Sequence, residues 1–153
     1  MKTEKEIVVR EATSEDVNKI IEVLTSTKLD KETWCGDRAF VVENLQKRLQ
    51  QKQFIVYVAE LNSSIAGFIS CVVFTSFWEC QKQGLIVDLF VHPAYQGKGV
   101  GSKLLETLVK KADAENIVEL HVSTKSENIK AQKLYRKFGF TGEQFLLERT
   151  QRS

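Results

Sequence analysis

The 153-residue sequence has one proline, three cysteines and a net charge of only +2. Because the single proline is Pro93, no proline-rich linker divides the chain, and one domain over residues 1–153 is expected. The cysteines (Cys35, Cys71 and Cys80) are odd in number and lack metal-ligand spacing, which favours reduced thiols over disulfides and predicts no metal site. The small net charge argues against a nucleic-acid partner, which requires a concentrated basic surface.

Long hydrophobic runs are also absent. No apolar stretch approaches the roughly 20 residues that a membrane-spanning helix needs, so no membrane association is expected. Residues 1–6 are polar and charged, unlike the apolar centre of a secretory signal peptide. We therefore expect a cytoplasmic protein. The hydrophobic content of 42% and charged content of 27% are those of an ordinary globular domain.

Hydrophobic periodicity predicts a mixed sheet flanked by helices, of the α/β (α+β) class, with the element order β-α-α-β-β-β-α-β-α-β-β. Strands are expected at residues 7–10, 54–60, 65–74, 85–91 and 118–122, near Phe140, and at 145–150. Helices are expected at residues 13–24, 40–49, 100–115 and 128–138. The polar segment at 25–37 is predicted to be a loop.

A glycine-rich segment at residues 96–101 (Gln-Gly-Lys-Gly-Val-Gly) separates the strand at 85–91 from the next helix. Such a loop leaves several backbone N–H groups unpaired at a helix N-terminus, where the helix dipole adds partial positive charge. The segment therefore predicts a phosphate-binding loop. It does not fit the dinucleotide-binding fingerprint, whose third glycine would fall on Ser102 or Leu104.

The remaining pattern, Gln-x-x-Gly-x-Gly, resembles the pyrophosphate loop of the GNAT superfamily of N-acetyltransferases. A second block, residues 128–140, resembles the family segment Asn-x-x-Ala-x-x-Leu-Tyr-x-x-x-Gly-Phe. The two blocks and their preceding strands cover about the C-terminal half of the chain. The resemblance implies an N-acetyltransferase that transfers an acetyl group from acetyl-CoA, the cosubstrate, directly to a primary amine in a ternary complex.

The same resemblance implies where acetyl-CoA binds. The main chain of the strand before the loop would hold the pantetheine arm and the acetyl group, beside the strand at 118–122. The loop would hold the pyrophosphate, and Asn128 would contact the cofactor arm, although an asparagine here can simply cap its helix. The expected cofactor-binding residues are Leu89, Phe90, Val91, Gln96, Gly97, Lys98, Gly99, Val100, Gly101, Ser102, Asn128, Ala131 and Tyr135.

Tyr135 is the candidate general acid. A phenol with a pKa near 10 is protonated at neutral pH and can donate to the departing thiolate. In the resembled family, the tyrosine at this place approaches the cofactor sulfur. The alternative is a core tyrosine, because Ala131, Leu134, Tyr135 and Phe138 form a helical stripe.

The sequence offers more than one candidate for the general base. Asp88 interrupts an apolar strand, so it can take the amine proton or order a water, or it can brace a loop or face solvent. Glu79 is a second candidate, and a chain of waters without a dedicated base is a third.

The acceptor is expected to contact the segments at 29–37 and 75–80. Trp34 and Trp78 lie near carboxylates, Glu79 among them, and this combination suits a small cationic amine, polyamine-like or aminoglycoside-like. The tryptophans can equally be core or dimer-interface residues. Three alternatives stay open: a peptide or protein amine as acceptor, a non-catalytic acyl-CoA-binding module, and a homodimeric interaction protein that uses its exposed aromatic residues.

Overall fold

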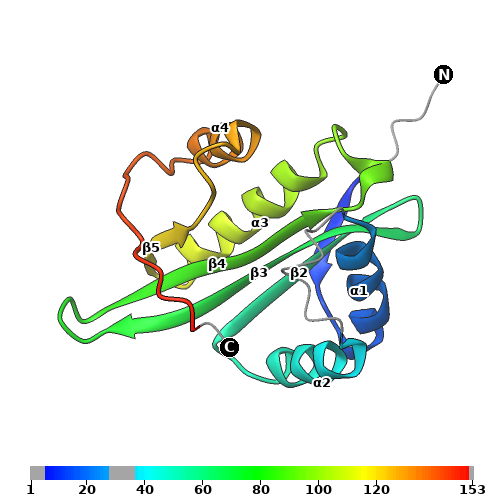
Figure 1. Cartoon of the computed structure of the whole chain (residues 1–153), viewed down its shortest axis with the longest axis horizontal. Helices are drawn as coiled ribbons and strands as arrows, with labels where there is room; N and C mark the ends of the chain where they lie inside the picture. Colours follow the sequence, from blue (N-terminus) through cyan, green and yellow to red (C-terminus); the bar gives the residue numbers. More distant parts are fainter. Residues whose placement is uncertain (1–5, 28–36, 152–153) are drawn as a thin grey trace.

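The computed structural model describes residues 6–27 and 37–151. Within them a five-stranded sheet has the order β1-β2-β3-β4-β5, antiparallel except for the parallel pair β4–β5 (Figure 1). The strands are β1 (Val8–Glu11), β2 (Phe54–Leu61), β3 (Ser64–Ser76), β4 (Gln81–Val91) and β5 (Ile117–Val122). The helices are α1 (Val17–Ser26), α2 (Arg38–Leu49), α3 (Val100–Ala114) and α4 (Ile129–Lys137). These elements confirm the predicted class and the mixed, helix-flanked sheet.

No helix in the described part of the chain is long and apolar enough to span a bilayer.

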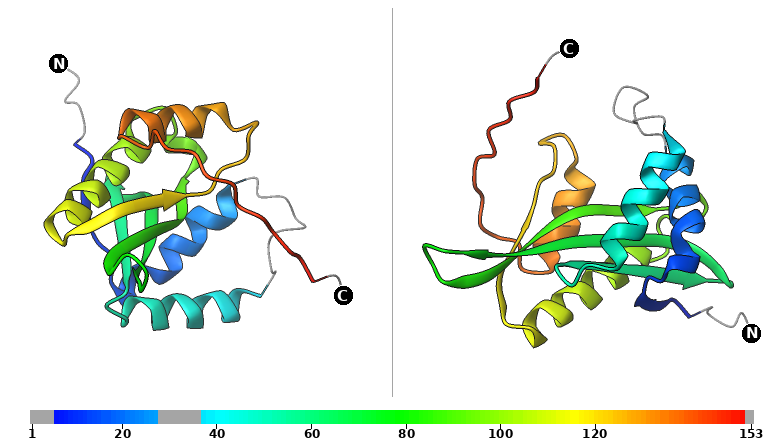
Figure 2. Two further views of the ribbon diagram at one scale, coloured as in Figure 1. Left: turned by 90° about the vertical axis from the view of Figure 1, so that its left-hand side faces the viewer. Right: turned by 90° about the horizontal axis from the view of Figure 1, so that it is seen from below.

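Helices cover both faces of the sheet, with α3 on one face and α1 on the other (Figure 2). We call these the α3 face and the α1 face. Strand β2 is buried on both: Ile55 and Ala59 join the cluster under α3, while Val56 and Val58 pack with α1. The buried stripe of α3 follows helical spacing, as predicted, and consists of Val100, Leu104, Leu105, Leu108 and Ala112.

The two strands predicted near Phe140 and over residues 145–150 are wrong, because residues 140–151 contain no strand. The chain turns at Gly139 (φ 92°), and the ring of Phe140 packs edge-on against Tyr135 at 5.5 Å between centroids. Residues 141–151 are all exposed and extend away from the body of the molecule (Figure 2). The β-forming side chains of this segment give only a local preference, and a strand also requires a neighbouring backbone.

The β3–β4 hairpin is longer than predicted. Pairing continues through Thr75↔Lys82 and Ser76↔Gln81 to a turn at residues 77–80. The segment at 75–80, which was expected to contact the acceptor, is therefore the tip of a hairpin. Its polar residues are compatible with strand because this end of the ladder is exposed to solvent and the two backbones satisfy each other.

Gly67 lies where β3 approaches both β4 and α3. A Cβ atom there would lie 2.7 Å from the carbonyl oxygen of Phe90 and 3.1 Å from Cγ1 of Val100. We expect Gly67→Ala to lower the free energy of unfolding by about 2–3 kcal/mol, because the packed backbone must move. Urea unfolding measures the change. Gly142→Ala, whose Cβ would meet nothing within 4 Å, is the control; an equal effect of both changes would refute the crowding at Gly67.

Arg10 links β1 to the start of α1 and to β2. Its guanidinium lies 2.7 Å from the Asp16 carboxylate and 2.7 Å from that of Glu60. The hydrogen bond from Arg10 is the main reason that the pKa of the buried Asp16 falls to about 2 from an ordinary 3.8. Because the folded pKa is the lower one, this stabilisation is complete above about pH 4 and is lost as the pH falls toward 2.

We therefore expect the free energy of unfolding to decrease by about 2 kcal/mol through this ion pair between pH 4 and pH 2. Urea titrations at a series of pH values measure the slope. In Asp16→Asn this contribution to the slope should disappear, and an unchanged slope in that variant would assign the acid sensitivity to other carboxylates.

Candidate active site

The glycine-rich segment forms a tight loop that ends at the N-cap of α3. Gly97 (φ 74°) and Gly99 (φ 83°) both adopt the left-handed conformation, and Gly99 is the N-cap. A Cβ atom on either would meet nothing within 4 Å. The backbone conformation, rather than crowding, is therefore what requires glycine at these positions.

The N–H groups of this loop are unpaired. Among the described residues, no acceptor receives a hydrogen bond from the backbone N–H groups of residues 97–102; the first helical bond joins the N–H of Lys103 to the oxygen of Gly99 at 3.0 Å. These donors, the dipole of the 15-residue helix α3 and the nearby Lys98 ammonium together suit a diphosphate. The Lys98 ammonium lies 5.6 Å from the centre of the Tyr95 ring.

Strand β4 contains a β-bulge at Val87. Its register with β3 shifts from Cys71↔Ile86 to Ser70↔Asp88, which leaves Val87 without a partner. Strict alternation would put Asp88 on the same face as Ile86, among the apolar residues under α3. The bulge instead turns Asp88 to the α1 face, where it accepts a hydrogen bond from the hydroxyl of Ser70.

Sequence reasoning did not identify Ser70. It is a buried polar residue within the apolar strand β3, which was the only available signal. Its pairing with Asp88 depends on the register of two strands, and a single-residue shift in that register would separate them.

Beyond the bulge, β4 loses its neighbour on the β5 side. The parallel pairing ends at Ile86↔Val122, whereas β4 continues to Val91. Within the described residues, the backbone of positions 87–91 therefore has no strand partner on that edge. The separation of these two strands begins next to Asp88.

Helix α4 brings Tyr135 toward this region. The side chain of Asn128 caps the helix by accepting a hydrogen bond from the N–H of Ala131 at 3.1 Å. Tyr135 is buried, which raises the pKa of its phenol above the ordinary value of 10. Among the described residues its hydroxyl has no hydrogen-bond partner. The phosphate loop, β4 and α4 converge at Gly101. A Cβ atom on Gly101 would lie 3.6 Å from Cδ2 of Leu134 on α4 and 3.7 Å from Cγ2 of Val91 on β4.

Glu79 and Trp78 lie elsewhere. Both are at the exposed turn of the β3–β4 hairpin, and β4 spans residues 81–91, so about 30 Å of strand separates them from the loop. Glu79 accepts a hydrogen bond from Gln83. The structure thus groups Asp88 and the phosphate loop at one end of β4, and Glu79 and Trp78 at the other. Trp34 falls outside the described residues.

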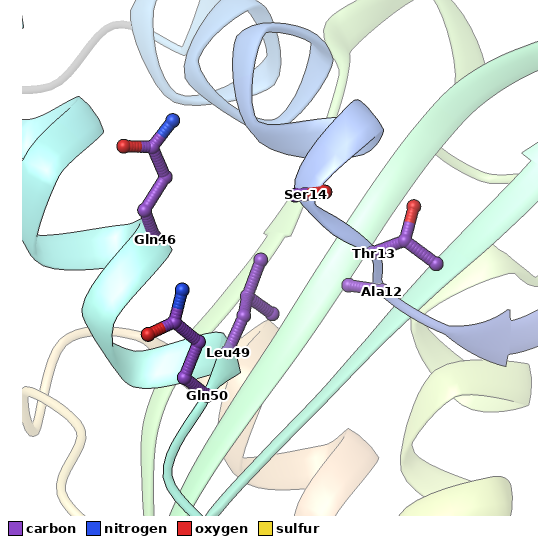
Figure 3. Close-up of a pocket in the computed structure, with 6 residues that line it drawn as sticks. All are labelled: Ala12, Thr13, Ser14, Gln46, Leu49 and Gln50. Carbon is purple, nitrogen blue, oxygen red and sulfur yellow. The ribbon is translucent and has the colours of Figure 1, made fainter.

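A hollow between the start of α1 and the end of α2 is separate from this region. It is lined by Ala12, Thr13, Ser14, Gln46, Leu49 and Gln50 (Figure 3). None of these residues belongs to the phosphate loop, β4 or α4, and none carries a titratable side chain. The hollow therefore offers no acid or base for a transfer reaction.

Comparison with known proteins identifies the family. The Acetyltransferase (GNAT) family matches residues 17–140. A relative from Archaeoglobus fulgidus, named as an uncharacterized N-acetyltransferase, is 30% identical over 131 residues, which are 83% of this chain and 88% of the relative. The L-methionine sulfoximine/L-methionine sulfone acetyltransferase of Salmonella typhimurium is 28% identical over 138 residues, 88% of this chain and 80% of that enzyme.

The fold has a solved counterpart. The structure of an aminoglycoside acetyltransferase from an uncultured soil metagenomic sample, in complex with sisomicin, superimposes with a TM-score of 0.79. The match covers 96% of each chain at 22% identity. With the family match over residues 17–140, these similarities show that the chain belongs to the acetyltransferase (GNAT) family and is an N-acetyltransferase.

Proposed function

We propose that this enzyme transfers the acetyl group of acetyl-CoA directly to the primary amine of a small cationic molecule, with both substrates bound together. The observation that carries the proposal is the separation of β4 from β5 beyond Ile86, next to a loop with unpaired N–H groups. In this proposal the N–H groups of residues 97–102 bind the diphosphate, and the Lys98 ammonium adds charge.

The backbone of β4 would align the acetyl group. The main chain of Leu89, Phe90 and Val91 has no strand partner on its β5 side, so it can pair with the amides of the pantetheine arm in the manner of an added strand. An N–H group here can also polarise the thioester carbonyl. Acetyl-CoA supplies the activated acetyl group; this chain supplies alignment and the two proton-transfer groups.

Asp88 is the proposed proton acceptor. An alkylamine with a pKa of about 10.4 is only about one part in a thousand neutral at pH 7, so the reactive form needs a base or a higher pH. The Asp88 carboxylate lies on the α1 face beside the gap and is held by Ser70. It would take the amine proton, directly or through one water, as the new C–N bond forms.

Tyr135 is the proposed proton donor. When the C–S bond breaks, the sulfur leaves as a thiolate, and the Tyr135 phenol would donate its proton to it. Burial raises the pKa of this phenol, so it stays protonated throughout the neutral range. Asp88 ends the cycle with one proton more and Tyr135 with one fewer, and exchange with water restores both.

The proposed preference for a cationic acceptor rests on the side chains that β4 and β5 place on the α1 face of the sheet. The register places Glu119 and His121 beside Gln83 and Leu85, on the same face as Asp88. Two carboxylates thus lie on this face, while Leu85 and Val87 are exposed apolar side chains. Together they suit an amine that carries a second positive charge on an alkyl or sugar frame.

A thiol-release assay with acetyl-CoA tests the proposal. The acceptors compared are spermidine, an aminoglycoside, L-methionine sulfone and a peptide with a free N-terminus. We expect kcat/KM to be highest for the two polycations. Turnover of the peptide alone, or of methionine sulfone in preference to both polycations, would overturn the proposed acceptor class.

The variant Asp88→Asn tests the proposed base. We expect kcat/KM at pH 7 to fall about 100-fold, and to recover about tenfold per pH unit up to about pH 9 as the amine loses its proton without help. Asp113→Asn, at an exposed position of α3, is the matched control and should leave the profile unchanged. A normal rate in Asp88→Asn would assign proton removal to water.

A further inference from the structure

The apolar packing on the α1 face stops partway along the β3–β4 hairpin. The cluster under α1 includes Phe68 of β3, with Phe90 of β4 at its margin. Beyond Asp88 the hairpin continues past both α1 and α2 (Figure 1). In this outer part of the face, Phe74 and Leu85 belong to neither buried cluster. The described residues therefore leave this part of the sheet open.

The open part of the α1 face is apolar. Strand alternation directs Phe74 of β3 and Leu85 of β4 to this face, where they are 43% and 37% exposed. Val72, which pairs with Leu85, is half-buried on the same face. We call Val72, Phe74 and Leu85 the apolar floor. An alkyl chain that lies on it would be removed from water together with these side chains.

A carboxylate lies at each end of the apolar floor. Asp88 is next to the gap, and Glu119 of β5 is at the other end, where it pairs with Gln83. The carboxylate of Glu119 lies 3.4 Å from Nε2 of Gln83 and 3.3 Å from Nε2 of His121. Glu79, at the turn beyond, also accepts a hydrogen bond from Gln83.

These carboxylates lack a basic partner. Among the described residues, no lysine or arginine forms an ion pair with Asp88 or with Glu119. An ammonium group of the acceptor would therefore be the cation partner of each carboxylate.

The strand register sets the spacing between the two ends. Asp88 pairs with Ser70 and Gln83 pairs with Phe74, so the two pairs are separated by four residues of β3, or about 13 Å. Glu119 lies one strand further across, about 5 Å away, which puts its Cα about 14 Å from that of Asp88. Both side chains stand out from the same face, so ammonium groups bound to them would lie about 11–14 Å apart.

We infer that Glu119 binds the distal ammonium of the acceptor and thereby selects diamines by length. The inference rests on the proposed function, because Asp88 must receive the reacting amine before Glu119 can define a length. An extended alkyl chain spans about 1.25 Å per bond, so this spacing corresponds to about eight to ten methylenes between the two nitrogens. A shorter diamine would leave its second ammonium over the apolar floor, away from any carboxylate.

A series of α,ω-diamines measures the selection in the thiol-release assay with acetyl-CoA, each diamine being compared with the monoamine of the same length. We expect kcat/KM for 1,8-diaminooctane, corrected for its two equivalent amines, to exceed that for octylamine about fivefold, the contribution of one partly exposed ion pair. For 1,3-diaminopropane against propylamine the ratio should be about one. A ratio that does not change with length would overturn the inference.

The variant Glu119→Gln keeps the size of the side chain and removes its charge. We expect it to abolish the preference for 1,8-diaminooctane by raising KM about fivefold with kcat unchanged, and to leave octylamine unaffected. A merely structural role of Glu119 would change both amines alike. Glu15→Gln, at an exposed position before α1, is the matched control and should keep the preference. Persistence of the preference in Glu119→Gln would refute length selection by this residue.

Failure of this inference is distinguishable from failure of the proposed function. Asp88→Asn should lower kcat/KM for the diamine and the monoamine by the same factor, because it removes the base and keeps the distal contact. If every amine were acetylated with a ratio of about one at all lengths, the proposed reaction would stand and the role of Glu119 would fail. If no amine of the series were acetylated, the proposed acceptor class would fail, and the inference with it.

Discussion

Gly99→Val is expected to weaken the binding of coenzyme A by about 100-fold, or about 3 kcal/mol, because it displaces at least one N–H donor from a charged phosphate. Gly99 has a φ of 83° and caps α3, so a β-branched residue forces the loop into another conformation. The N–H groups of residues 97–102 then no longer point to one place. Isothermal titration calorimetry with coenzyme A measures the loss.

Gly139→Val separates loss of binding from general strain. Gly139 also has a left-handed backbone (φ 92°), and a Cβ there would also meet nothing within 4 Å. We expect the two variants to lose a similar free energy of unfolding, roughly 1–2 kcal/mol. Only Gly99→Val should lose affinity for coenzyme A. If Gly99→Val kept its affinity for coenzyme A, the loop would not be part of the phosphate-binding site.

Tyr135→Phe is expected to lower kcat by about 100- to 1,000-fold, the contribution of a positioned general acid. The hydroxyl makes no hydrogen bond among the described residues, while the ring packs against Phe140. Phenylalanine keeps the ring, so the affinity for coenzyme A and the thermal midpoint should change little. Single-turnover measurement of acetyl transfer, together with calorimetry, separates the chemical step from binding.

Leu134→Ala is the control for packing on α4. Leu134 approaches Gly101 but has no proton to donate. We expect it to lower stability and to change kcat much less than Tyr135→Phe does. If kcat were unchanged in Tyr135→Phe, Tyr135 would not be the proton donor. It would then be a core residue, which is the alternative that the helical stripe of α4 also predicted.

The helices and the central strands could be predicted because their signals are local. The α3 stripe from Val100 to Ala112 repeats at helical spacing, and the side chain of the N-cap Asn128 accepts a hydrogen bond from the first turn of α4. The phosphate loop could also be predicted, since the positive φ angles of Gly97 and Gly99 depend on residue type.

The ends of the sheet could not be predicted, because they depend on partners. Residues 81–84 (Gln-Lys-Gln-Gly) look like a polar loop, yet they pair with residues 73–76 at the end of β3. Residues 145–150 look like a strand, yet no neighbour is present for them in the described chain. Strand formation is a property of two segments, and the sequence of one of them carries only a preference.

From its sequence alone, this protein could be recognised by two motif blocks, their order and the chemistry of a phosphate loop followed by a tyrosine-bearing helix. Only the tertiary structure decided which face Asp88 occupies, that Ser70 holds it, and that Glu79 and Trp78 lie at the far end of the hairpin. The physical reason is the bulge at Val87: one unpaired residue reverses the side-chain alternation of a strand, and the register that creates it is set between strands.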